Sequence, residues 1–261
     1  MPIPTIETWM HRQQFNIEID DWVQELLSQK SGYMVIAGRT GIGKTVIAIQ
    51  LAHCLATGEP FFGLETKQCT VGYIAFEGAE DKMDDRFQKI RQNFLPTEGR
   101  LKFSIEKPVK LKKKEDYLAE LVEGCDVVFF DPVKYMVSGD YIKPSVANEF
   151  VELLMSFSEK NNLVCVLLLQ VRKPNENSLL YPGDCFEIKG AADYVESATS
   201  VLVMERKHQG HKVKGKGFAK TNPDNIMLYF DKHRDAIGGL SPKELMLNRQ
   251  KLMFEEIIIK T

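Results

Sequence analysis

The 261-residue sequence has no excess of charge of either sign and no long hydrophobic run. Its 34 lysines and arginines nearly balance 36 aspartates and glutamates, so a contact with nucleic acid would need a local basic patch. Apolar runs such as Leu163–Leu169 are far shorter than the roughly 20 residues that cross a bilayer, and Met1–Met10 has no basic-then-apolar leader. These absences predict a cytoplasmic protein without membrane contact.

Cysteine is also scarce, and a chain of 261 residues buries a core large enough to exclude small disulfide-linked scaffolds. The five cysteines are odd in number and lack the C-x-x-C pairs typical of zinc or redox sites. We interpret them as reduced, packed side chains; they are Cys54, Cys69, Cys125, Cys165 and Cys185. The remaining composition, with 44% hydrophobic and 27% charged residues, is that of an ordinary globular domain.

Short apolar runs that are typical of buried strands alternate with helical patterns over most of the chain. The predicted strands are Tyr33–Ala37, Val71–Phe76, Val127–Phe130 and Leu163–Leu169. The predicted helices are Thr45–Ala56, Glu80–Asn93, Tyr117–Glu123 and Val146–Lys160. This alternation predicts an α/β fold with a mostly parallel central sheet and helices on both faces.

The two ends of the chain have different patterns. Ile17–Lys30 is partly amphipathic and predicts a short entry helix, while Ser241-Pro242-Lys243-Glu244 is a helix-start pattern that predicts a terminal helix, packed at home or on a neighbouring subunit. Three strand-like segments without helices between them predict antiparallel additions to the sheet edge: Ser200–Met204, Lys214–Ala219 and Ile226–Phe230. We therefore divide the chain into an N-terminal segment (1–31), a core (32–235) and a C-terminal helical segment (236–261).

The most specific motif is a phosphate loop between a predicted strand and a predicted helix. It reads Gly38-Arg39-Thr40-Gly41-Ile42-Gly43-Lys44-Thr45. Its glycines let backbone N–H groups turn inward toward phosphate oxygens, and the following helix adds the positive end of its dipole. Lys44 supplies a charge for the β- and γ-phosphates, and the hydroxyl of Thr45 suits Mg²⁺. The motif predicts that the protein binds ATP with Mg²⁺.

Two acids stand at the ends of neighbouring predicted strands. Asp131 closes the run Val127–Phe130 and is the candidate to hold Mg²⁺ together with Thr45, although an Asp-Pro pair is also a common turn. Glu77 follows Val71–Phe76 and is the candidate to activate the attacking water. Its alternative interpretation is a helix-start charge.

These motifs, in this order, give the chain from about Gly32 to Asp231 a resemblance to the RecA-like superfamily, most closely to the RepA-like hexameric helicases among single-domain AAA-family ATPases. Chaperone-like ring ATPases place the glutamate directly after the metal-binding aspartate, whereas Asp131 here precedes Pro132. The resemblance implies that Gln170, at the end of the strand Leu163–Leu169, senses the γ-phosphate. A glutamine bonded to the backbone is the alternative.

The resemblance also suggests roles for basic residues. By this resemblance, the loops after the Asp131 strand and after the Gln170 strand would face a central channel. The candidates for contact with single-stranded DNA are therefore Lys134, Lys143, Arg172 and Lys173. Their alternative is a solvated surface. Lys220 matches the basic residue that reaches into the neighbouring subunit's site, although the second basic position is occupied by Asn222. Arg86 either stacks on adenine or pairs with Glu80 or Asp81.

Together these features predict an ATP-hydrolysing, RecA-like motor that forms a homo-oligomeric, hexameric ring and acts on single-stranded DNA in replication, mobilisation or repair. One alternative is a nucleotide-driven switch that controls a protein partner and ignores DNA. Another is a small-molecule kinase, which would need several arginines in a lid; the segment Val171–Glu187 contains only Arg172.

Overall fold

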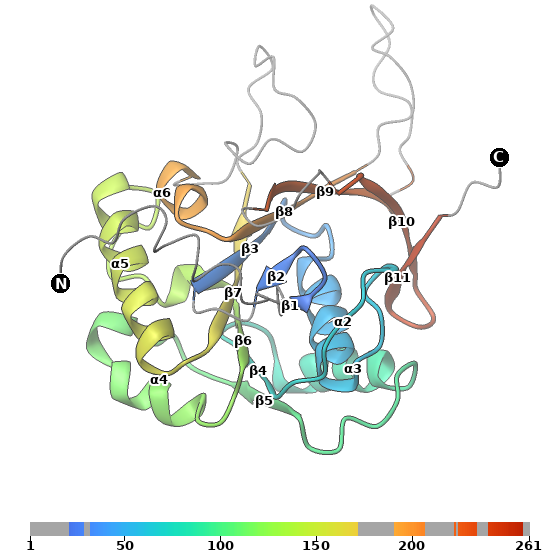
Figure 1. Ribbon diagram of the computed structural model, residues 1–261, viewed down its shortest axis with the longest axis horizontal. Coiled ribbons are helices and arrows are strands. Elements are labelled where there is room, and N and C mark those ends of the chain that lie inside the picture. The colour runs from blue at the N-terminus through green and yellow to red at the C-terminus, as the bar shows by residue number, and fades with distance from the viewer. Residues whose placement is uncertain are drawn as a thin grey trace, which may run out of the picture.

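A computed structural model describes residues 21–28, 32–171, 191–206, 222, 224–233 and 240–257 of the chain. Its centre is a nine-stranded sheet with the order β11-β10-β9-β8-β3-β7-β6-β4-β5 (Figure 1). The strands are β3 (Gly32–Gly38), β4 (Val71–Ala75), β5 (Leu101–Ile105), β6 (Val127–Asp131), β7 (Val164–Gln170), β8 (Ser200–Arg206), β9 (Asn225–His233), β10 (Lys243–Asn248) and β11 (Met253–Glu256). The predicted α/β fold, mostly parallel with antiparallel edge strands, is confirmed.

The strands from β8 to β5 run parallel, and their carboxyl ends meet at one edge of the sheet. The apolar runs that predicted β3, β4 and β6 are buried along their whole length, as expected for strands covered on both faces. In the register of the sheet, Gly38 lies opposite Gln170 and Ala75 lies opposite Asp131. Residues that follow different strands in the sequence are therefore brought side by side.

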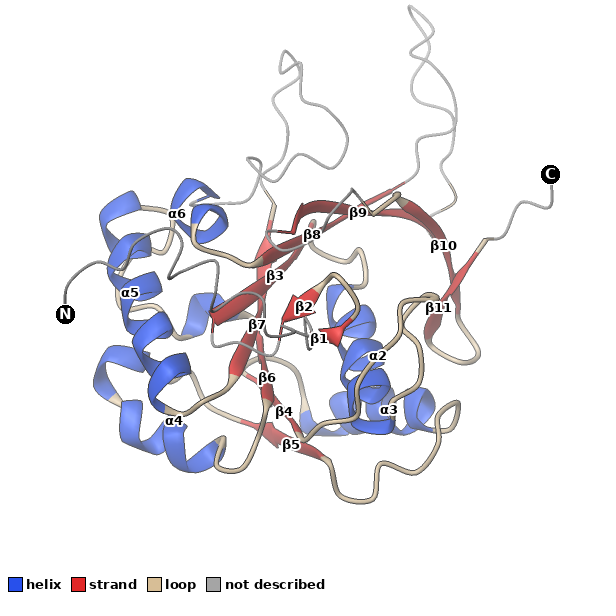
Figure 2. Cartoon of the chain, viewed as in Figure 1, coloured by secondary structure: helices blue, strands red, loops and turns tan. Residues whose placement is uncertain are grey.

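Helices cover both faces of this sheet. Figure 2 shows α2 (Lys44–Thr57) and α3 (Glu80–Arg91) on one side, and α4 (Glu115–Leu121), α5 (Pro144–Lys160) and α6 (Ala191–Glu196) on the other. Successive residues of β3 alternate between the two cores: Met34 and Ile36 belong to the first, whereas Tyr33 and Val35 belong to the second. Short 3₁₀ turns occur at Leu111–Lys113 and Val133–Tyr135.

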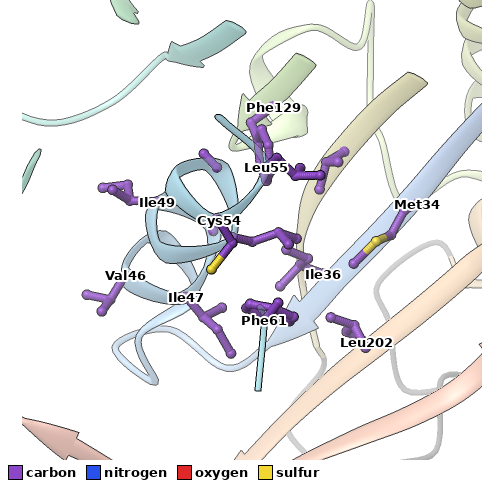
Figure 3. Packing of buried hydrophobic residues seen from close by; sticks show 14 of the residues in the cluster. Met34, Ile36, Val46, Ile47, Ile49, Cys54, Leu55, Phe61, Phe129 and Leu202 are labelled. Atoms are coloured by element: carbon purple, nitrogen blue, oxygen red, sulfur yellow. The ribbon is translucent and has the colours of Figure 1, made fainter. Parts of the chain in front are cut away.

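The helix α2 is buried nearly all round. Every residue from Val46 to Ala56 is buried, and Figure 3 shows Ile47 of this helix beside Phe61 and Leu55 beside Phe129. Such a helix is apolar on every side because it lies between the sheet and other elements. Its N-terminus, where the phosphate loop ends, is thereby held firmly against the carboxyl edge of the sheet.

Three predictions about the ends of the chain are wrong. The segment from Ser241, expected to be a helix, forms a hairpin of β10 and β11. Leu245 and Leu247 alternate as in a strand, and Leu245 pairs with Ile226 of β9. The hydrogen bonds that β10 makes to strands on both sides outweigh a local helix cap, which is worth about 1 kcal/mol. β8 runs parallel to β3, so only β9, β10 and β11 are antiparallel additions.

The entry helix expected at Ile17–Lys30 is also wrong in its described part. There, β1 (Asp21–Val23) and β2 (Leu27–Ser28) form a small antiparallel hairpin, and Glu25 takes a left-handed turn conformation (φ 54°) between them. Leu26 and Leu27 are buried in this hairpin, so the same apolar residues fit either reading of so short a window. The expected strand Lys214–Ala219 lies outside the described residues.

No helix within the described ranges combines the length and the apolar character that crossing a bilayer requires.

Candidate functional site

The phosphate loop leaves β3 at Gly38 and enters α2 at Lys44. Gly41 (φ 75°) and Gly43 (φ 104°) adopt left-handed conformations that favour glycine, and they curl the loop back over the start of the helix. Gly43 is the N-cap of α2, where no side chain caps the helix and no acid occupies the first turn. The backbone N–H groups of the first turn and the positive end of the helix dipole are thus free to meet an anion.

The ammonium group of Lys44 lies within the curl of this loop. Its Nζ donates to the carbonyl oxygens of Gly38 at 2.9 Å and Arg39 at 3.0 Å. Burial lowers the pKa of Lys44, and the nearby carboxylates of Asp131 and Glu77 oppose that shift. A positive charge is therefore held where the loop's N–H groups would receive phosphate oxygens.

Asp131 ends β6 directly beside the first turn of α2. Thr45 Oγ1 donates to Asp131 Oδ2 at 2.7 Å, and Tyr73 OH donates to the same oxygen at 2.8 Å. The carboxylate is only 8% exposed, and burial raises its pKa against the lowering effect of these two hydrogen bonds and of Lys44. Thr45 and Asp131, which are 86 residues apart in the sequence and were predicted to hold Mg²⁺ together, are in direct contact.

The hydroxyl and carboxylate oxygens of this pair fit a bound Mg²⁺. Mg²⁺ favours one or two protein oxygens together with substrate phosphates and water. The two hydrogen bonds that the described residues make to the Asp131 carboxylate both end on Oδ2. Among the described residues, no group of three or more His, Cys, Asp or Glu side chains is placed to hold a metal ion.

Glu77 follows β4 and faces the same space. Its Oε2 lies 2.9 Å from Lys134 Nζ and accepts a hydrogen bond of 3.1 Å from Tyr135 OH. Burial pushes the pKa of Glu77 upward, but Lys134, Tyr135 and Lys44 outweigh it and the pKa is lowered overall. Glu77 is thus an ionised carboxylate at neutral pH, held by a cation from the turn after β6.

One cavity of about 430 Å³ brings these groups together, within the usual size range of small-molecule sites. The predicted residues that line it are Thr40, Gly41, Gly43, Lys44, Thr45, Glu77, Arg86, Asp131, Lys134 and Gln170. Both acids and the phosphate loop therefore share one site.

Gln170 and Arg86 complete the walls of the cavity. Gln170 Nε2 donates to Thr40 Oγ1 of the phosphate loop, so its amide contacts a loop side chain rather than the backbone. Arg86 lines the cavity from α3, and its guanidinium lies 3.4 Å from the sulfur of Met83. Among the described ion pairs, none joins Arg86 to Glu80 or Asp81.

The basic residues predicted to contact DNA or a neighbouring subunit fall into different places. Lys134 lines the cavity, where its ammonium pairs with Glu77 and lies over the ring of Tyr135. Lys143 is exposed at the start of α5 and does not line the cavity. Arg172, Lys173 and Lys220 lie outside the described residues.

The C-terminal hairpin also contributes to the site, which no motif in the sequence indicates. Leu252, in its turn, lines the cavity. Phe254 of β11 packs on the phosphate loop so closely that a Cβ at Gly43 would lie 2.7 Å from its ring. Gln50 of α2 fixes this strand, donating to Phe254 O and accepting from Phe254 N, each at 3.0 Å. Phe254 lies 211 residues after Gly43 in the sequence, so no local pattern reveals the contact.

Three tyrosines were missed as well: Tyr135, which donates to Glu77, and also Tyr73 and Tyr141. Tyr73 lies within the segment that carried the resemblance, but its contact with Asp131 depends on the pairing of β4 and β6. Tyr141 lines the cavity from the loop before α5. The available signal for Tyr73 was that a tyrosine buried in a strand needs a hydrogen-bond partner.

Comparison with known proteins agrees with this geometry. A family model described as an AAA domain matches residues 2–176, more than half of the chain, and the chain therefore belongs to that family. Membership of this family indicates nucleotide-dependent ATPase activity. No curated protein matches the sequence. The match covers the phosphate loop, both acids and Gln170, and it ends before β8 and the C-terminal hairpin.

Proposed function

We propose that this AAA-domain ATPase is a RecA-like motor of the RepA-like type, a hexameric ring that uses Mg²⁺-ATP hydrolysis to act on single-stranded DNA in replication, mobilisation or repair. The phosphate loop and Lys44 would bind the β- and γ-phosphates. Thr45 and Asp131 would hold Mg²⁺, which supplies neutralising charge to those phosphates. Arg86, in the cavity wall, would lie against the base.

In this proposal Glu77 is the base that takes a proton from the attacking water. Its carboxylate is ionised, but Lys134 and Tyr135 hold Oε2. Gln170 would report on the γ-phosphate through its hydrogen bond to Thr40 of the loop. Lys220, by resemblance, would add a charge from the neighbouring subunit.

The observation that carries the DNA part of the proposal is the contact between Lys134 and Glu77. Lys134 lies in the turn after β6, the segment that the resemblance places toward nucleic acid, and its ammonium is 2.9 Å from the Glu77 carboxylate. A DNA phosphate that attracted Lys134 would release Glu77. Lys134 would thus link DNA binding to the chemistry of the ATP site.

The experiment is ATP turnover with and without single-stranded DNA, over a range of salt concentrations. We expect DNA to stimulate turnover and added salt to reduce the stimulation, because salt lowers the free energy that phosphate contacts gain by releasing counterions. The Lys44→Ala variant controls for contaminating ATPases. Turnover that single-stranded DNA leaves unchanged would contradict the motor function and favour the switch that acts on a protein partner.

A further inference from the structure

The hydroxyl of Tyr73 is buried against the carboxylate expected to hold the metal. Tyr73 is 1% exposed, and its OH donates to Asp131 Oδ2 at 2.8 Å. The same oxygen receives the hydroxyl of Thr45 at 2.7 Å. Two donors thus converge on one carboxylate oxygen and fix the plane of the Asp131 carboxylate.

The position of that hydroxyl is set by the packing of the tyrosine ring. In the parallel register of β4 and β6, Tyr73 lies opposite Phe129 and Ala75 lies opposite Asp131. The ring stacks on Phe129, with centroids 5.5 Å apart, and meets Phe87 edge-on at 5.2 Å. Because the ring is held on two sides, its oxygen cannot follow the carboxylate if Asp131 turns.

We propose that Tyr73 is a positioning residue for the metal site: it holds Asp131 Oδ2 so that Oδ1 faces Mg²⁺ or its water. The proposal rests on the assignment of Thr45 and Asp131 to Mg²⁺ in the proposed function, but not on DNA or on a ring. Groups that orient metal ligands typically matter about 10–100-fold in metal affinity or activity when they are removed.

The test compares two single-atom deletions. Tyr73→Phe removes the donor to Asp131 and keeps the ring. Tyr33→Phe is the matched control, because Tyr33 is also fully buried and its OH donates at the same 2.8 Å distance, to the carbonyl of Tyr194. Mn²⁺, which can replace Mg²⁺ and is visible by electron paramagnetic resonance, is titrated into each protein with a non-hydrolysable ATP analogue. Nucleotide binding is measured separately in EDTA, and folding by thermal denaturation.

We expect Tyr73→Phe to weaken Mn²⁺ binding by about 10-fold or more while nucleotide affinity in EDTA stays at the wild-type value. Tyr33→Phe should lower the melting temperature to a similar extent and leave Mn²⁺ binding unchanged. Wild-type Mn²⁺ affinity in Tyr73→Phe, or an equal loss in Tyr33→Phe, would overturn the positioning role.

A third variant separates this failure from that of the metal site itself. Asp131→Asn should bind Mn²⁺ more weakly than Tyr73→Phe, because it removes the ligand's charge rather than its orientation. If Asp131→Asn binds Mn²⁺ like the wild type, the metal assignment in the proposed function is wrong and the role of Tyr73 fails with it.

Discussion

Lys134 connects the turn after β6 to the carboxylate of Glu77, and it is the first of the groups that lower the pKa of this candidate base. The ion pair is half-exposed, with the Lys134 side chain 37% and the Glu77 side chain 54% exposed. An exposed pair of this kind contributes little to folding, typically below about 1 kcal/mol. Its effect is therefore expected in the pH dependence of activity rather than in stability.

Lys134→Met should move the acid limb of the ATPase pH profile to higher pH. Burial raises the pKa of Glu77, and Lys134 is the first of the groups that lower it, so removing the ammonium lets this pKa rise. A base works only when ionised, and activity is lost as pH falls through its pKa. The measurement is kcat/KM against pH, in the absence of DNA.

Lys143→Met is the matched control, since Lys143 is exposed and does not line the cavity. It should leave the acid limb where the wild type has it. An acid limb unchanged in Lys134→Met would show that Glu77 is not the titrating base or that Lys134 does not govern it. The free energy of unfolding of both variants should stay within about 1 kcal/mol of the wild type.

At the scale of elements, the C-terminal hairpin supports the phosphate loop. Phe254 is buried against Gly43, and Gln50 bonds both backbone groups of Phe254 at 3.0 Å. Asn248 orders the hairpin turn by accepting from the N–H groups of Gln250 and Lys251. The hairpin and the N-terminal half of α2 therefore form one packed unit.

Gly43→Ala should reduce ATP binding severely, by at least about tenfold, because the new Cβ would meet the Phe254 ring at 2.7 Å and Gly43 has φ 104°. Either the loop or the hairpin must shift, and the curl of N–H groups is lost. The measurement is equilibrium binding of a fluorescent ATP analogue.

Gly63→Ala is the control, since Gly63 has φ 79° but nothing within 4 Å of the added Cβ. It should cost roughly 1 kcal/mol of stability and leave ATP affinity unchanged; wild-type affinity in Gly43→Ala would contradict the supporting role of the hairpin.

The difference between local patterns and contacts of distant segments explains which elements could be predicted from the sequence. β3, the phosphate loop and α2 were predictable because a buried apolar run, a glycine motif and an apolar helix follow one another within the segment from Gly32 to Thr57. The hairpin was mistaken for a helix because Ser241–Glu244 carries a local cap signal, whereas its strand character comes from pairing with β9. β5 was missed because Leu101–Ile105 is not a continuous apolar run like the predicted strands; its apolar residues alternate with Lys102 and Ser104, as in a half-buried edge strand.

The candidate site divides in the same way. Lys44, Thr45, Glu77, Asp131 and Gln170 could be placed together because the ends of parallel strands meet at one edge. The partners that hold them, Tyr73, Tyr135 and Phe254, could not, because each contact depends on strand register or on packing between distant segments. The groups that act on the nucleotide are therefore easier to identify from a sequence pattern than the groups that orient them.

At the scale of the whole molecule, the proposed ring makes a prediction about mass in solution. Light scattering with a non-hydrolysable ATP analogue should give six times the subunit mass, because RecA-like sites are completed at subunit contacts. Lys44→Ala, which lacks the charge that binds the phosphates, should assemble less under the same conditions. A wild-type protein that stays monomeric with nucleotide would contradict the ring.

The central claim is that one cavity, formed by the phosphate loop and acids from two strand ends, hydrolyses ATP with Glu77 as the base. Single-turnover hydrolysis by Glu77→Gln, measured beside its affinity for ATP, tests this claim most directly. We expect Glu77→Gln to bind ATP with wild-type affinity and to hydrolyse it more slowly by about 100-fold or more, because its general base is removed. Hydrolysis at the wild-type rate in Glu77→Gln would contradict it.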